Sequence, residues 1–233
     1  VWTIRDMGFS SAQEAIIACQ KRVCQVIAAA GSGKTRTVIG LLENRIQAGV
    51  KPERILALSF SRKAVAEMRS RVGAQWRTRL EISTFHSFCY RHLRRTGLLP
   101  GKLLTPENRY HFLLDRLRSA GQSTLGIPYD VLLRFPDSFR RLLPDLCMQV
   151  HHAFYSYKRS LGAFEFDDLS RLLLLSLKHL PLREAYDLIV VDEFQDTDPL
   201  QLQFLQQMAF QQLIVVGDDW QAIYGFRGAT VEP

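Results

Sequence analysis

The sequence predicts an α/β fold in which a parallel sheet is covered by helices on both faces. Three observations lead to this prediction. Short apolar runs alternate with helical patterns near both ends of the chain, a glycine-rich loop follows the first apolar run, and two acidic residues follow a later one. Strands that alternate with helices in this way form parallel sheets, because each return to the sheet is made by a helix. With 233 residues the chain is near the upper limit of one hydrophobic core, so we expect one domain with an appendage or two small domains.

The first 95 residues supply three predicted strands, each followed by a predicted helix. The first of these helices is amphipathic, because Val38, Ile39, Leu42 and Ile46 share one face. The predicted strands are 23–28, 55–60 and 80–83, and the helices that follow them are 35–48, 63–72 and 85–95.

The last third of the chain returns to the same alternation. Predicted strands cover 188–191 and 213–216, and predicted helices cover 167–180 and 199–208. Pro199 suits the first turn of its helix, since an N–H group there would have no partner within the helix.

The middle of the chain breaks this pattern. Residues 96–162 contain leucine-rich helical patches and no convincing strand. Their prolines are Pro100, Pro106, Pro128, Pro136 and Pro144. We interpret this stretch as a helical insertion that divides the α/β domain into a first part, 1–95, and a second part, 163–233.

Composition and charge exclude several classes of protein. Apolar residues make up 47% of the chain, which excludes disordered and fibrous proteins. Thirty Lys and Arg against 23 Asp and Glu give a net charge of +7, which favours a polyanionic partner. No apolar run is long enough to span a bilayer, so we expect no membrane partner. The four cysteines form no CxxC pair, which indicates a reducing, cytoplasmic location without zinc or iron–sulfur clusters: Cys19, Cys24, Cys89 and Cys147.

Residues 28–35, Ala-Ala-Ala-Gly-Ser-Gly-Lys-Thr, form a glycine-rich loop between the first predicted strand and its helix. Backbone N–H groups at such a turn converge on an anion, and the helix dipole adds to their attraction. Lys34 would reach the β- and γ-phosphates of a nucleotide, and the Thr35 hydroxyl would hold Mg²⁺. Only the first glycine of the G-x-x-x-x-G-K-[ST] pattern is missing, replaced by Ala28. The flanking strand and helix favour a phosphate loop over a flexible turn.

Asp192 and Glu193 directly follow the predicted strand 188–191. Two acids after an apolar strand are by themselves common helix-capping residues. A phosphate-loop ATPase, however, needs a carboxylate at the end of a neighbouring strand. Asp192 would then complete the Mg²⁺ shell, and Glu193 would orient or deprotonate the attacking water.

Six motifs together resemble a known family. Residues 192–197, Asp-Glu-Phe-Gln-Asp-Thr, and 216–229, which begin Val-Gly-Asp-Asp-Trp-Gln, look like motifs II and III of the UvrD/Rep family of superfamily 1 DNA helicases. The other four resemble motif I (29–36), motif Ia (58–68), the DNA-contact motif that follows it (83–87) and a stretch before motif II (166–169). They occur in the family's order over almost the whole chain, which makes chance an inadequate explanation.

The resemblance implies a RecA-like first motor domain, called 1A, with a helical insertion, called 1B. It implies binding and hydrolysis of ATP with Mg²⁺, and movement 3′ to 5′ on single-stranded DNA up to a junction with duplex DNA. A second, C-terminal RecA-like domain would complete the ATP site and half of the DNA track. Because the chain starts at Val1 and stops at Pro233, we expect it to be a piece of a longer protein that turns over slowly by itself.

The same resemblance assigns roles to individual residues. Gln13 would read adenine, since its amide can pair with both N6 and N7. Gln221 would act beside Lys34, Asp192 and Glu193 as a sensor of the γ-phosphate. The nucleotide contacts would be Gln13, Ala30, Gly31, Ser32, Gly33, Lys34, Thr35 and Arg36. The DNA contacts would be Phe60, Arg62, Lys63, Thr84, His86, Tyr224, Phe226 and Arg227.

Some of these residues also have simpler interpretations, and some depart from the family pattern. Without the resemblance, Phe60 is more often a core residue than a base platform, and His86 is more often a structural histidine. Arg62 replaces the usual Asn of motif Ia and adds a positive charge on the expected DNA face. Phe226 replaces a usual Trp but keeps a ring on which a base can stack.

Two other functions remain open from the sequence. The motor of a RecB/AddA-type helicase–nuclease shares these motifs, and a nuclease motif after Pro233 would reveal it. The second alternative is a DNA-binding ATP switch or scaffold that does not unwind DNA. Asp192 and Glu193 would serve either a motor or a switch, so these residues do not discriminate between them.

Overall fold

The computed structural model describes residues 8–29, 31–99, 101–121, 144–179 and 186–218. The chain divides into two compact units. The first contains residues 1–93 and 170–233, and the second contains residues 94–169. Each unit is described by itself below. No helix within the described ranges is long and apolar enough to cross a membrane.

The first unit is built on a five-stranded parallel sheet, which confirms the predicted α/β fold. The strands are ordered β1-β5-β4-β2-β3. Two late strands, β4 and β5, therefore separate β1 from β2. In open sheets of this kind ligands bind beyond the carboxyl ends of the strands, where the strand order reverses. The strand bounds are β1 (Val23–Ile27), β2 (Ile55–Ser59), β3 (Glu81–Thr84), β4 (Tyr186–Asp192) and β5 (Phe210–Gly217).

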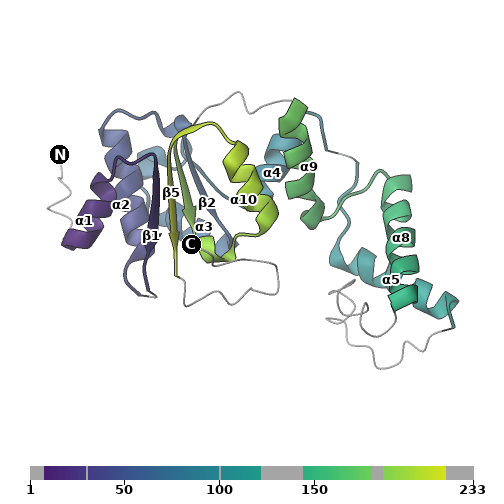
Figure 1. Ribbon diagram of the computed structural model, residues 1–233. Helices are drawn as coiled ribbons and strands as arrows, with labels where there is room; N and C mark the ends of the chain where they lie inside the picture. Colours follow the sequence, from purple (N-terminus) through teal and green to yellow (C-terminus); the bar gives the residue numbers. More distant parts are fainter. Residues whose placement is uncertain (1–7, 30, 100, 122–143, 180–185, 219–233) are drawn as a thin grey trace. The chain divides into compact units, whose positions relative to one another are not determined.

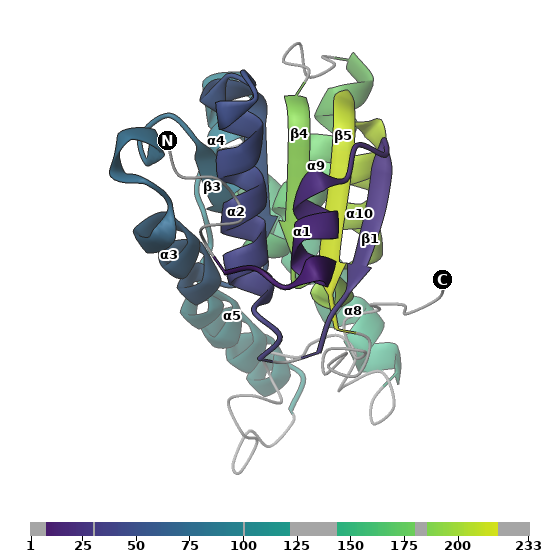
Figure 2. The same cartoon turned by 90° about the vertical axis from the view of Figure 1, so that its left-hand side faces the viewer.

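Helices cover both faces of this sheet (Figure 1). On one face, α1 (Ser11–Ala18) and α2 (Lys34–Gln47) lie over β1, β5 and β4 (Figure 2). The helix α3 (Arg62–Arg71) shares their apolar core, which contains Leu42, Met68 and Val190. On the other face, Phe204 of α10 (Pro199–Gln207) packs against α4 (Phe85–Arg95), with ring centroids 5.5 Å from Phe88. The remaining elements of this unit are α9 (Phe166–His179), which begins in the second unit, and the short 3₁₀ helices η2 (Pro52–Arg54), η3 (Ala74–Trp76) and η4 (Phe194–Asp196).

A buried arginine of α2 fixes the end of α1. Arg45 is 5% exposed, and its guanidinium donates hydrogen bonds to the carbonyl oxygens of Ile17 (2.9 Å) and Cys19. Its Nε donates to Gln212 Oε1 of β5 at 3.2 Å, and Gln212 Nε2 donates to the Cys19 carbonyl at 2.8 Å. The last carbonyls of a helix have no partner within the helix, so Arg45 satisfies them from outside. Burial of the guanidinium lowers the pKa of Arg45.

We expect Arg45→Met to lower the free energy of unfolding by about 2 kcal/mol, because it removes the donor to the buried Ile17 carbonyl and to Gln212 Oε1. Urea denaturation measures this change. Lys51→Met, which removes one exposed charge, is the control and should change stability by less than about 0.5 kcal/mol. Equal stabilities of the Arg45 variant and the control would show that this network does not secure α1.

The second unit contains α5 (Pro106–Ser119) and α8 (Pro144–Ser160). The ring of Phe112 packs on Phe154, with centroids 5.2 Å apart. Lys158 forms ion pairs with Glu165 at 3.1 Å and Asp168 at 2.7 Å. Among the described residues of this unit, the β-pairing is limited to an isolated bridge between Leu103 and Phe164. That the insertion is a separate domain with bounds 96–162 stays a prediction.

Candidate active site

The glycine-rich loop joins β1 to α2 and needs its glycines. Gly31 and Gly33 have φ angles of 75° and 83°, in the left-handed region that favours glycine. A Cβ on Gly33 would lie only 2.9 Å from Gln13 Nε2. Gly33 is the N-cap of α2, and no side chain caps the first turn of this helix. The N–H groups of that turn are therefore suited to bind an anion.

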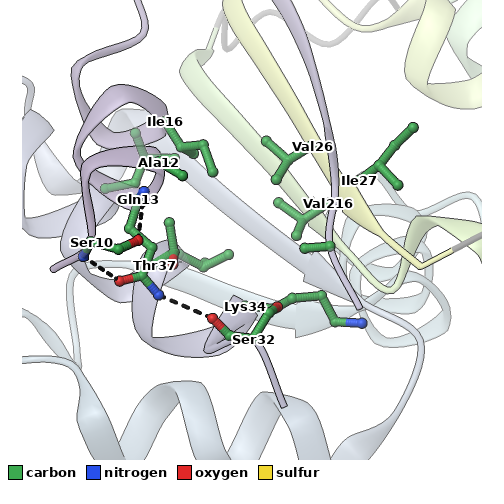
Figure 3. A pocket seen from close by; sticks show the side chains of 13 residues that line it. Ser10, Ala12, Gln13, Ile16, Val26, Ile27, Ser32, Lys34, Thr37 and Val216 are labelled. Atoms are coloured by element: carbon green, nitrogen blue, oxygen red, sulfur yellow. Dashed lines mark hydrogen bonds between the residues drawn. The ribbon is translucent and has the colours of Figure 1, made fainter. Parts of the chain in front are cut away.

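Gln13 of α1 lies against this loop (Figure 3). Its Nε2 donates to the Ser32 carbonyl at 3.1 Å, and its Oε1 accepts from the Ser10 N–H at 3.0 Å. Each atom of the amide keeps capacity for one more hydrogen bond. The same residues border a cavity of about 260 Å³ with an apolar wall that includes Ile16 and Val26. Apolar walls of this kind suit flat aromatic ligands, and that Gln13 reads adenine here stays a prediction.

Lys34 connects three segments that are far apart in the sequence. It is the first residue of α2, and its Nζ lies 3.6 Å from Glu193 Oε2 and 3.9 Å from Asp218 Oδ2. Glu193 follows β4 and Asp218 follows β5. The Lys34 side chain is only 9% exposed. The structure thus brings the lysine of the loop and the acids of the late strands together at one edge of the sheet.

Asp192, the last residue of β4, has an oxygen without a partner. The residue is 2% exposed, and its Oδ1 has no hydrogen-bond partner among the described residues. Burial raises the pKa of Asp192 to about 6, and the adjacent Glu193 charge adds to the increase. A buried carboxylate oxygen without a donor is unfavourable unless a cation or a water ligand of a cation lies beside it, so the site fits the predicted Mg²⁺.

Asp192 would hold the cation together with Thr35, which lies in the first turn of α2. Within the described ranges, no group of three or more His, Cys, Asp or Glu side chains could hold a metal by itself. Mg²⁺ typically binds one or two carboxylates together with substrate phosphates, which agrees with this sparse set of ligands.

Glu193 has an unusual backbone conformation. Its φ of 54° and ψ of 47° are left-handed, and it is the one non-glycine residue with positive φ among the described residues. Such conformations cost free energy and are concentrated at functional sites. Gln195 Nε2 donates to Glu193 Oε2 at 2.8 Å, and its Oε1 accepts from the Asp218 N–H at 3.0 Å. A Cβ on Gly217 would lie 2.8 Å from the same Oε1, so glycine leaves room for this bridge.

The bridge by Gln195 was not predicted from the sequence. Gln195 and Asp218 belong to the two quoted motifs, but the spacing of the motifs does not show that one side chain joins them. In this structure the Gln195 amide holds the Glu193 carboxylate in place relative to the end of β5.

The five candidate DNA contacts within the described ranges lie at the carboxyl ends of β2 and β3. Arg62 and Lys63 are exposed in the first turn of α3, while Phe60 and His86 are half-buried. Thr84 is 7% exposed, and its hydroxyl already has a partner, since Oγ1 donates to Ser87 Oγ at 2.8 Å. These positions adjoin the end of β4, because β2 lies between β3 and β4. Their contact with DNA stays a prediction.

Six predicted site residues remain to be placed, of which the structure describes Arg36 alone. Arg36 lies over the Phe9 ring, 4.9 Å from its centroid. Five further predicted residues fall outside the described ranges: Ala30, Gln221, Tyr224, Phe226 and Arg227.

Comparison with known proteins decides the family. A family model described as "AAA domain" matches residues 12–227, which is most of the chain. The chain belongs to this AAA domain family. The fold of the family, that of nucleotide hydrolases, agrees with the phosphate loop and the parallel sheet described above.

Relatives of this AAA domain chain include bacterial proteins of the type that the motifs resemble. The chain is 32% identical over 235 residues to YjcD of Bacillus subtilis. It is 31% identical over 238 residues to the ATP-dependent DNA helicase PcrA of Staphylococcus epidermidis, and 30% over 237 residues to PcrA of Staphylococcus aureus. These alignments cover 88–89% of this chain but only 31–32% of the relatives, so the chain spans about a third of their length. The predicted membership of the UvrD/Rep family is confirmed.

Proposed function

We propose that this chain is the first motor domain of an ATP-dependent DNA helicase, one that moves 3′ to 5′ on single-stranded DNA and unwinds duplex DNA at junctions. The observation that carries the proposal is the position of Lys34. It joins the phosphate loop to acids at the ends of β4 and β5, next to the buried Asp192 carboxylate, whose Oδ1 has no partner among the described residues. A motor needs these groups together, because hydrolysis of ATP requires charge neutralisation and a positioned water.

The residues of the chain have separate tasks in this function. The N–H groups at the start of α2 bind phosphate, and Lys34 neutralises charge that develops on the terminal phosphate. Mg²⁺, when bound with Asp192 and Thr35, would supply further neutralisation of phosphate charge. Glu193 orients the attacking water, and Gln195 fixes the carboxylate that does so. Before ATP binds, Glu193 and Asp218 occupy the ammonium group of Lys34, so the triphosphate has to compete with them.

The function also requires a second RecA-like domain and a DNA track. We expect a further domain of the intact polypeptide to close on the nucleotide, and Arg62 and Lys63 to contact DNA phosphates. A strand-displacement assay on the intact polypeptide tests the activity and its direction. We expect unwinding of a duplex with a 3′ single-stranded tail and none with a 5′ tail. ATP hydrolysis stimulated by DNA without unwinding would instead favour an ATP switch or a pure translocase.

The double variant Arg62→Ala/Lys63→Ala should weaken the binding of single-stranded DNA. Each phosphate contact that is lost should reduce the slope of log K against log salt by about 0.7. Fluorescence anisotropy at several salt concentrations measures the slope. The matched control is Lys21→Ala/Lys51→Ala, which removes two exposed charges that precede β1 and β2, at the opposite edge of the sheet. A salt-insensitive affinity, or equal loss in both double variants, would contradict the placement of DNA at the ends of β2 and β3.

A further inference from the structure

Ser59 is the last residue of β2, and its hydroxyl forms no hydrogen bond with the site residues described above. The residue is 0% exposed, and its Oγ has no hydrogen-bond partner among the described residues. A buried hydroxyl without a partner is unfavourable, so such a group in a folded protein indicates a bound water, ion or ligand.

The register of the sheet places Ser59 beside Asp192. In the parallel pairing of β2 with β4, Ser59 lies opposite Asp192, just as Ala57 lies opposite Val190. Alternate residues of a strand point to the same face. Ala57 and Val190 belong to the core beneath α2, so Ser59 and Asp192 also face the side of the sheet that α2 covers. The start of α2 is the phosphate loop, so both side chains are at the end of the sheet where the loop lies.

Two neighbouring buried groups therefore lack partners at the same place. The Asp192 carboxylate has an Oδ1 without a donor, and the Ser59 hydroxyl has neither donor nor acceptor among the described residues. The two atoms are not hydrogen-bonded to each other. A water molecule between them would satisfy both, since it can donate one hydrogen to each oxygen.

We propose that Ser59 is a positioning residue of the cation site, whose hydroxyl, together with Asp192 Oδ1, holds a water ligand of the nucleotide-bound Mg²⁺. This inference rests on the proposed function, since it requires a cation next to Asp192. Groups that hydrogen-bond to a metal's ligands orient these ligands, and their loss typically weakens metal binding about 10–100-fold. Ser59 would thus contribute to metal affinity without touching the metal.

Threonine and valine have nearly the same shape, so substituting each for Ser59 distinguishes the effect of the hydroxyl from the effect of packing. Ser59→Thr keeps the hydroxyl, and Ser59→Val replaces it by a methyl group. We expect Ser59→Val to weaken the affinity for Mn²⁺ in the presence of ADP about tenfold, while Ser59→Thr stays within about twofold of the wild type. Titration of the intact polypeptide measures this, with free Mn²⁺ read from its EPR signal. Ser59→Ala, which adds no atoms to the core, should show the same loss as Ser59→Val.

Ser83 of β3 provides the matched control. It is 1% exposed, and its Oγ also has no partner within the described residues. Ser83 lies opposite Leu58, so its side chain points to the other face of the sheet from Ser59. We expect Ser83→Val to leave the Mn²⁺ affinity unchanged. An equal loss in both Val variants would overturn the proposal, because the effect would then come from packing.

Asp192→Ala makes a failure of this proposal distinguishable from a failure of the proposed function. If Asp192→Ala leaves the Mn²⁺ affinity unchanged, no cation is held there and both ideas fail. If it weakens binding while Ser59→Val and Ser59→Ala do not, the cation site stands and the role of Ser59 is wrong. A water that bridges the two residues without a metal would give this second result.

Discussion

Lys34→Ala is expected to reduce the ATP hydrolysis of the intact polypeptide by about 10³-fold and to leave the fold intact. The Lys34 ammonium is almost buried and is held at the phosphate loop by Glu193 and Asp218. Loss of one fixed charge or donor that stabilises a transition state typically costs 10²–10³-fold in rate, and a nearly buried cation should lie at the upper end of this range. Release of inorganic phosphate under saturating ATP and single-stranded DNA measures the rate.

Two comparisons make this result interpretable. Lys51→Ala removes an exposed charge at the other edge of the sheet and should hydrolyse ATP at the wild-type rate. The circular dichroism spectrum and the unfolding midpoint of Lys34→Ala should be close to those of the wild type, because the variant adds no atoms to the core. Turnover like that of the wild type in a folded Lys34→Ala protein would refute the assignment of the phosphate loop.

The sequence predicted the elements well where one physical signal dominates. Helix 85–95 has the bounds that the structure gives to α4, since its apolar face has a clear helical period. The strand prediction 213–216 is shorter than β5, which begins at Phe210, because Gln211 and Gln212 interrupt the apolar run. In the structure, Gln211 donates to Asp187 of β4 at 2.7 Å, and Gln212 joins the network of Arg45. Such distant partners make polar residues compatible with a strand, and no local pattern reveals them.

The site could be predicted only as far as its motifs extend. The loop with Lys34 and the pair Asp192 and Glu193 follow from local sequence, since each motif is continuous along the chain. The positions of Gln195 and Ser59 do not. The bridge by Gln195 depends on β5 ending beside β4, and the pairing of Ser59 with Asp192 depends on β2 lying next to β4. Strand order and register are determined by packing across the whole sheet. The patterns of separate segments carry no information about that packing.

Asp192→Asn is expected to abolish activity and, at the same time, to stabilise the metal-free protein. The pKa of Asp192 is raised from 3.8 to about 6, mainly by burial. An acid with a raised pKa binds its proton more tightly in the folded state, so its contribution to stability is lost as pH rises from about 4 to about 6. At pH 7.5 the ionised carboxylate then costs up to about 3 kcal/mol, at 1.36 kcal/mol per pKa unit. Asparagine removes this cost but cannot replace the anionic ligand.

Urea denaturation in the presence of EDTA measures the first effect. Asp192→Asn should exceed the wild type in free energy of unfolding by about 1–3 kcal/mol at pH 7.5, and the difference should vanish near pH 4, where both side chains are neutral. With Mg²⁺ and ADP present, the free energy of unfolding should rise more in the wild type than in Asp192→Asn, because a ligand stabilises the state that binds it.

Asp187→Asn is the matched control, because it makes the same change near the other end of the same strand. Both carboxylate oxygens of Asp187 accept hydrogen bonds from Arg54, each at 2.8 Å, and Asp187 Oδ1 also accepts from Gln211. This carboxylate has its partners, so the asparagine variant should not be stabilised at any pH. A stability gain in both variants would trace the effect to the net charge of the chain. A gain in Asp192→Asn alone, in a protein that no longer hydrolyses ATP, would show that the fold retains an unfavourable buried charge at the place where the reaction requires it.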